Sequence, residues 1–192
     1  MLTKLLCLGD SLTEAYGILP EKGWVALLKK DLNIPIQNCG ISGDTTAGML
    51  TRFHAEVKPQ QPSHLILMGG TNDISLNMSC ETSLGNVLAI SRHAKRENCQ
   101  IILGIPPSSF ISEESPKSKV FLQSHAFQKK LSEWQSVLRS FAMEDDLPVI
   151  DFSEVLKEEH FLNDGVHPNE IGHLAMKCHV LKVLKSLYLQ KD

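Results

Sequence analysis

The sequence has no apolar run long enough to cross a membrane and no long run of charge of one sign. A membrane span needs about 20 consecutive apolar residues, so we expect no transmembrane segment. Lysine and arginine are scattered along a chain whose formal net charge is −3, whereas nucleic-acid-binding surfaces gather basic residues into a stripe or patch. We therefore expect neither a membrane span nor nucleic acid as a partner.

The cysteines offer neither a disulfide framework nor a zinc site. They are odd in number, and no two are spaced as a CxxC pair: Cys7, Cys39, Cys80, Cys99 and Cys178. Three lie in or beside apolar segments, where free cysteine behaves as a small buried hydrophobe. No His, Cys or carboxylate cluster has metal-ligand spacing, so we expect no metal and no cofactor. With no secretory signal evident, the cytoplasm is the default expectation, or the periplasm if a signal has been removed.

Length and hydrophobic periodicity predict one α/β domain over residues 1–192, which is ample chain for a buried core. Short apolar runs alternate with amphipathic stretches, which predicts a flavodoxin-like, three-layer α/β/α fold with a five-stranded parallel sheet. The expected strands are Leu5–Leu8, Pro35–Asn38, His64–Met68, Gln100–Gly104 and Leu147–Ile150. The expected helices are Trp24–Leu32, Ala47–Val57, Ser83–Glu97, Phe127–Phe141 and Ile171–Leu184.

Ser11 follows the first expected strand and is the first candidate for chemistry. The apolar run Leu5–Leu8 is typical of a strand buried on both faces, and Gly9-Asp10-Ser11 ends it with small, turn-forming residues. Open α/β sheets collect their ligand-binding groups at the carboxyl ends of the strands. A serine in that place is either a nucleophile or a hydroxyl that caps the following turn. These residues alone do not separate the two roles.

Four turns are expected to bring five chemical groups to one edge of the sheet. Ser11, Gly43 and Asn72 follow the first three strands, and Asp164 and His167 follow the fifth. A hydroxyl, an imidazole with a carboxylate, and N–H donors are the groups that acyl transfer uses for attack, proton transfer and oxyanion stabilisation. Each also has a structural alternative, because Asp164 could be a turn acceptor, Gly43 a left-handed turn residue and Asn72 a helix cap.

His167 differs from the other seven of the eight histidines. It follows a turn, a carboxylate stands three residues earlier at Asp164, and Pro168 restricts the chain beside it. The other histidines lie on expected helices, within strands or on polar stretches without a candidate nucleophile. We therefore expect His167 to be the histidine that takes part in chemistry.

Four blocks of the sequence resemble the SGNH hydrolases, the GDSL lipase and esterase family. They follow the family's order across nearly the whole chain: GDSLTEAYG at 9–17, NCGISGDT at 38–45, GGTND at 69–73 and DGVHPN at 164–169. Within the family the chain is most similar to the compact bacterial thioesterase I/lysophospholipase L1/arylesterase group. The resemblance implies Ser11 as nucleophile, His167 as base and Asp164 as its orienting acid, with Ser11, Gly43 and Asn72 as oxyanion donors.

The resemblance also implies an activity: a serine hydrolase that cleaves carboxylic esters or thioesters through an acyl-enzyme intermediate. Its partner would be a small-molecule substrate such as a short acyl or aryl ester, an acyl-CoA or a lysophospholipid. Two features depart from the family pattern. Thr71 stands between Gly70 and Asn72. Gly40 is a second glycine in its block, and Gly43 is assigned as the donor because it is the glycine within the stretch Ile-Ser-Gly-Asp-Thr.

Two other functions stay open beside this one. A carbohydrate O-acetyl esterase would use the same residues. A non-catalytic module that binds an anion or nucleotide would use Gly9–Thr13 as a loose phosphate loop. Phosphate loops contain more glycines than this segment, and the charge of Asp10 would repel an anionic ligand. Turnover of a chromogenic ester separates the enzymes from the binding module.

One long segment, Pro106–Lys119, is rich in proline and serine and is expected to be a loop. Loops of this length in a compact domain are often lids or binding loops. Phe110 and Ile111 are the apolar groups that would cover an acyl chain. The alternative is a disordered surface loop, and the sequence favours neither over the other.

Overall fold

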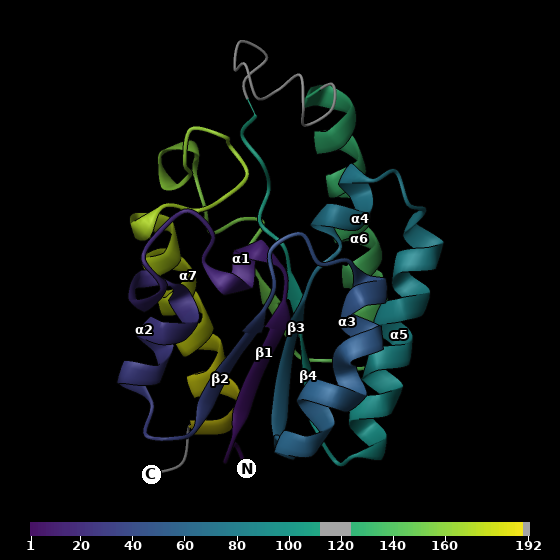
Figure 1. Ribbon diagram of the computed structural model, residues 1–192, viewed down its shortest axis with the longest axis vertical. Coiled ribbons are helices and arrows are strands. Elements are labelled where there is room, and N and C mark those ends of the chain that lie inside the picture. The colour runs from purple at the N-terminus through teal and green to yellow at the C-terminus, as the bar shows by residue number, and fades with distance from the viewer. Residues whose placement is uncertain (112–123, 190–192) are drawn as a thin grey trace.

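The computed structural model describes residues 1–111 and 124–189. Five parallel strands form one sheet in the order β2-β1-β3-β4-β5 (Figure 1). The strands are β1 Leu5–Gly9, β2 Ile36–Gly40, β3 His64–Met68, β4 Gln100–Ile105 and β5 Val149–Asp151. This is the flavodoxin-like order. The predicted five-stranded α/β sheet is confirmed, and each strand begins and ends within two residues of its predicted bounds.

The five expected helices are present, and two short ones are added. The helices are α1 Ser11–Glu14, α2 Trp24–Asp31, α3 Thr46–Arg52, α4 Thr71–Ser75, α5 Cys80–Arg96, α6 Ser124–Glu144 and α7 Glu170–Leu184. The sequence did not predict α1 and α4, because four or five residues are too few to show a helical period. They follow β1 and β3 directly, so each starts at the edge where the site residues were expected.

The prediction of a single α-helix over Ala47–Val57 is wrong for the second half of that range. Helix α3 ends at Arg52 and a π-helical turn, Phe53–Val57, continues the chain. The wider turn keeps the side chains of Phe53 and Val57 both buried. Pro59 follows in a 3₁₀ turn, and its missing N–H prevents a regular helix from continuing.

Two apolar cores lie on the two faces of the sheet, because successive side chains of a strand point to opposite faces. One core joins the strands to α3, α5 and α6, and the other joins them to α2 and α7. Figure 1 shows these helices as two layers on either side of the sheet. Leu6, Leu8, Leu65 and Leu67 face the first layer, and Leu5, Cys7, Ile66 and Met68 face the second. The continuous apolar runs of β1 and β3 are explained by this double coverage.

The beginning of the proposed lid is part of the folded body. Residues 106–111 are mostly buried, and Ile111, 6% exposed, packs in the core shared with α5 and α6. The expectation that Ile111 would cover an acyl chain is therefore wrong, because its side chain already has apolar neighbours. The rest of the predicted loop, 112–119, lies outside the described residues.

The five cysteines are all free, and Cys7, Cys39 and Cys99 are buried as expected of small hydrophobes. In the part of the chain that the structure describes, no helix is both long enough and apolar enough to span a membrane.

Candidate active site

Ser11 is the first residue of α1, at the carboxyl end of β1. The cap of this helix is Asp10, whose side chain accepts the N–H of Leu12 at 3.0 Å. The capping role considered for Ser11 is therefore filled by its neighbour. The Ser11 hydroxyl, in a buried position, instead lies 3.0 Å from Nε2 of His167.

A chain of hydrogen bonds joins Ser11, His167 and Asp164. Nδ1 of His167 lies 2.9 Å from Oδ2 of Asp164, and Oδ1 of Asp164 accepts the backbone N–H groups of Val166 and His167, each at 3.0 Å. Partial burial alone would raise the pKa of Asp164, but the bonds from the His167 ring and the two N–H groups outweigh it and hold the pKa at about 2. The carboxylate is ionised at neutral pH, so Nδ1 carries the ring proton and Nε2 is left to accept one.

The turn that carries Asp164 and His167 is fixed to its surroundings on both sides. Leu162 N donates to the His167 carbonyl at 2.8 Å, and Phe110 N donates to the Gly165 carbonyl at 2.7 Å. A Cβ at residue 165 would lie 2.2 Å from the Phe110 carbonyl oxygen, so only glycine allows this approach. The described start of the Pro106–Lys119 segment therefore supports the histidine turn.

Asn169 completes the last sequence block by capping α7. Its side-chain oxygen accepts the N–H groups of Ile171 and Gly172 at 3.0 Å each. This cap lies two residues after His167 and fixes the start of α7 at Glu170. A side-chain oxygen on these first N–H groups is the usual way to satisfy donors that have no partner inside the helix.

Gly43 occupies the left-handed position of a turn that follows β2. Its φ is +81°, and the turn closes through Asp44 N and the Ile41 carbonyl at 3.1 Å. Within residues 1–111 and 124–189, the backbone N–H groups of Gly43 and Ser11 have no acceptor. The N–H of Gly40 donates to Oδ1 of Asn38 at 2.9 Å. Of the two glycines in this block, Gly43 is thus the one whose N–H is available.

Asn72 lies beside the Gly43 turn. It is the second residue of α4, and its Nδ2 donates to the Asp44 carbonyl at 2.9 Å. This bond uses one N–H of the amide and leaves the other. The turn is also tied to α1, since the backbone N–H and the hydroxyl of Ser42 both donate to the Glu14 carboxylate. The structure therefore links the segments of all three predicted oxyanion donors.

Asp73 holds α3 and α4 together, and the sequence analysis assigned it no role. It is fully buried and accepts the Thr46 N–H at 2.9 Å, the Thr46 hydroxyl at 2.5 Å and the Ser83 hydroxyl at 3.0 Å. Asn86 Nδ2 donates to the same Thr46 hydroxyl at 3.0 Å. No local sequence pattern signals these bonds, because their partners lie in other helices.

Tyr16 is a second residue that the sequence analysis did not assign to the site. Its ring centroid lies 4.6 Å from that of His167, tilted by 46°, while 52% of the residue stays exposed. The preceding Ala15 has a left-handed backbone (φ 78°), and Tyr16 N donates to the Ser11 carbonyl at 3.1 Å. The backbone reversal after α1 thus places an exposed aromatic ring on the histidine.

Two buried titratable groups stand behind the nucleophile. Burial raises the pKa of Asp10 to about 7, against the opposing influence of the Leu12 hydrogen bond and of His167, and its Oδ2 has no partner among the described residues. Burial lowers the pKa of His173 to about 4. Nδ1 of His173 accepts the Trp24 N–H at 3.3 Å, so this neutral imidazole acts as a cap for α2.

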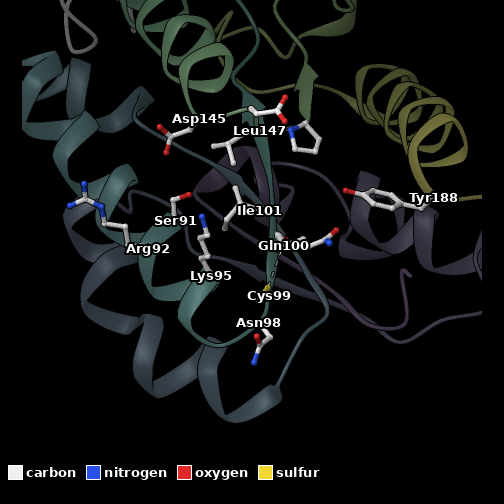
Figure 2. A pocket seen from close by; sticks show the side chains of 12 residues that line it. Ser91, Arg92, Lys95, Asn98, Cys99, Gln100, Ile101, Asp145, Leu147 and Tyr188 are labelled. Carbon is white, nitrogen blue, oxygen red and sulfur yellow. Dashed lines mark hydrogen bonds between the residues drawn. The ribbon is translucent and has the colours of Figure 1, made fainter.

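A cavity of about 660 Å³ lies away from these residues. Figure 2 shows Lys95, Gln100, Asp145 and Tyr188 among the side chains that line it. Gln100 begins β4 and Leu147 precedes β5, so the cavity is at the amino ends of the strands, whereas Ser11 is at the carboxyl end of β1. The cavity is therefore separate from the candidate active site. In the described residues, no group of three or more His, Cys, Asp or Glu side chains is placed to hold a metal ion.

Comparison with known proteins identifies the family of this chain. A model of the GDSL-like lipase/acylhydrolase family matches residues 7–175. The esterase TesA of Pseudomonas aeruginosa is 33% identical over 112 residues, 54% of this chain and 56% of that protein, so the match spans little more than half of the relative. Thioesterase 1/protease 1/lysophospholipase L1 of Escherichia coli K12 is 28% identical over 170 residues, 86% of this chain and 75% of that protein.

Among solved structures, a lipolytic protein of the G-D-S-L family from Desulfitobacterium hafniense has a TM-score of 0.82 at 24% identity, covering 95% of this chain and 99% of that one. A likeness at that identity shows the fold. The family match extends from β1 into α7 and includes all four sequence blocks. With the matching fold and the hydrogen-bonded Ser11, His167 and Asp164, it leads to one conclusion: the chain belongs to the GDSL-like lipase/acylhydrolase family.

Proposed function

We propose that this protein is a serine esterase that hydrolyses small carboxylic esters or thioesters with apolar acyl or aryl groups. The observation that carries the proposal is the hydrogen-bond chain from Ser11 Oγ through both ring nitrogens of His167 to Asp164, at 3.0 and 2.9 Å. A hydroxyl is a weak nucleophile, and an adjacent base held in one tautomer by a carboxylate is the usual way to activate it. Membership of an acylhydrolase family agrees with this chemistry.

The reaction follows from the roles of the three side chains. Ser11 Oγ attacks the ester carbonyl carbon while its proton moves to Nε2 of His167. The tetrahedral intermediate collapses to an acyl-Ser11, and Nε2 returns the proton to the departing alcohol or thiol. Water then attacks the acyl group and loses a proton to Nε2. As the second tetrahedral intermediate collapses, Nε2 returns this proton to Ser11 Oγ, which releases the carboxylic acid and free Ser11. Asp164 stays ionised throughout, since its pKa is about 2.

We propose that three N–H donors, in the segments that follow β1, β2 and β3, hold the oxyanion. These are the backbone N–H groups of Ser11 and Gly43 and the remaining N–H of the Asn72 amide. Donors fixed before the reaction stabilise the charge that develops on the carbonyl oxygen without having to reorganise.

The substrate class is inferred from the apolar groups beside the site. Tyr16, next to His167, is 52% exposed, and Ile41, the first residue after β2, is 45% exposed. An exposed aromatic ring against the base offers an apolar surface to the acyl or aryl group of a substrate held at Ser11. The names esterase and thioesterase 1/protease 1/lysophospholipase L1, carried by the two relatives, fit the same class of acyl compounds.

A substrate panel tests this proposal. It would compare p-nitrophenyl acetate, butyrate and octanoate, phenyl acetate, octanoyl-CoA and acetylated xylo-oligosaccharides, each with the unaltered protein and with Ser11→Ala. We expect hydrolysis of the p-nitrophenyl and phenyl esters, and a loss of at least about 10³-fold in kcat in Ser11→Ala. Turnover of the acetylated sugars alone would point to a carbohydrate esterase. Full activity in Ser11→Ala, or no hydrolysis of any ester, would contradict the proposal.

A further inference from the structure

Arg52, the last residue of α3, is bonded to several segments that surround the site. Its Nε donates to Asp44 Oδ2 at 2.8 Å, and its Nη2 donates to the carbonyls of Gly9 at 3.0 Å and Cys39 at 2.7 Å. Nη1 lies 2.7 Å from the Glu56 carboxylate. The side chain is only 11% exposed, and that of Asp44 is 10% exposed. One guanidinium therefore makes four hydrogen bonds in a position that is nearly closed to solvent.

The partners of Arg52 are neighbours of the three predicted oxyanion donors. Gly9 ends β1 two residues before Ser11, and Cys39 lies near the end of β2, before the Gly43 turn. Asp44 follows Gly43 in the chain, and its own carbonyl accepts the Asn72 amide at 2.9 Å. Arg52 thus joins the end of β1, the end of β2 and the turn to which Asn72 is bonded.

We propose that Arg52 is a positioning residue that sets the geometry of the oxyanion donors of Ser11, Gly43 and Asn72. It does so from behind the site, chiefly through Asp44, and contacts no reacting atom. The inference rests on the proposed esterase function. Oxyanion donors are effective only when they lie about 2.7–3.1 Å from the developing charge. A displacement of about 1 Å in a reacting geometry can cost on the order of 10²-fold in rate.

The chemistry of arginine explains why this residue type is needed. A guanidinium presents five N–H donors in one rigid plane, and here four bonds run to two backbone carbonyls, those of Gly9 and Cys39, and to two carboxylates, those of Asp44 and Glu56. A lysine ammonium keeps the charge and most of the stem but cannot span these acceptors at once. Replacement by lysine therefore relaxes the geometry while keeping the ion pair with Asp44.

The test variant is Arg52→Lys, assayed with p-nitrophenyl acetate. Because the donors act mainly in the transition state, we expect kcat to fall about tenfold while KM changes less than twofold. The control is Arg139→Lys. Arg139 also bonds a carboxylate, with Nε 2.8 Å from Asp151 Oδ2, and its Nη2 donates to the Ser153 hydroxyl. Its side chain is 40% exposed, and it bonds none of the donor segments. The control variant is expected to stay within twofold of the unaltered protein.

A double-mutant cycle with Asn72→Ala separates positioning from general destabilisation. If Arg52 acts through the donors, the tenfold loss shrinks to about threefold once Asn72 has lost its amide. The inference would be overturned if the two single-variant losses in kcat simply multiplied in the double variant. An unchanged kcat in folded Arg52→Lys would also overturn it. If Arg52→Lys does not fold, Asp44→Asn removes the charge of the pair and is evaluated by the same cycle. If neither the unaltered protein nor Arg139→Lys hydrolyses the ester, the proposed function fails, and this inference fails with it.

Discussion

The two halves of the candidate site are built in different ways. The half that carries the nucleophile and base depends on contacts within short segments: Asp10 caps the helix of Ser11, and Asp164 accepts N–H groups two and three residues further along the chain. The half that carries the oxyanion donors depends on contacts between distant segments. Asn72 bonds Asp44 28 residues away, and Arg52 bonds Gly9 43 residues away. The turns of the first half are shaped by local sequence, although the Ser11–His167 bond that joins them spans 156 residues. The second half depends mainly on the assembled sheet.

The largest effect is expected from a substitution in the first half of the site, which carries the nucleophile and base. Asp164→Asn keeps a side-chain oxygen for the two N–H groups of the turn but removes the negative charge that holds the His167 proton on Nδ1. We expect kcat for p-nitrophenyl acetate to fall about 10³–10⁴-fold at neutral pH with the fold retained. Kinetics and circular dichroism of the variant check this. A loss of less than about tenfold would mean that Asp164 does not orient His167.

A smaller effect is expected from a substitution in the second half of the site, which carries the oxyanion donors. Asn72→Ala deletes the only predicted oxyanion donor that is a side chain, and it also removes the bond to the Asp44 carbonyl. We expect kcat to fall about 10²–10³-fold, with KM nearly unchanged because the lost bond strengthens in the transition state. An increase in KM at unchanged kcat would show instead that Asn72 binds the ground state of the substrate.

The same division explains what the sequence could predict. The strands were predictable because runs such as Leu5–Leu8 and His64–Met68 are apolar throughout, as double burial requires. The five candidate site residues were predicted from their places after strands, together with the family resemblance. The roles of Asp73 and Arg52 were not, since each bonds partners that only the folded sheet brings near. Tyr16 lay inside a recognised block, but its contact with His167 depends on the left-handed backbone of Ala15.

Asp10 lies where the two halves meet and is expected to produce the smallest effect. Its pKa is raised from 3.8 to about 7, first by burial and also by the charges of Asp44 and Asp73, while His167 opposes the change. A raised pKa means that the folded state holds the proton more tightly than the unfolded chain. This group therefore favours folding most below about pH 4, and that contribution is lost as the pH rises towards 7.

Asp10→Asn tests that dependence, because asparagine also caps a helix but does not ionise. Between pH 5 and pH 7.5 we expect Tm to fall by about 5–10 °C less in the variant than in the unaltered protein. Thermal unfolding at the two pH values, followed by circular dichroism, measures the difference. Equal changes in Tm for both proteins would show that Asp10 does not titrate in this range.

The central claim is that Ser11 is a nucleophile activated by His167. Its most direct test is reaction with an organophosphonate that traps active serines, followed by intact-mass measurement and peptide mapping. The account predicts one adduct per chain, located on Ser11, and no adduct in Ser11→Ala at the same protein concentration. An adduct on another residue, or a protein that hydrolyses esters while Ser11 stays unmodified, would contradict the account.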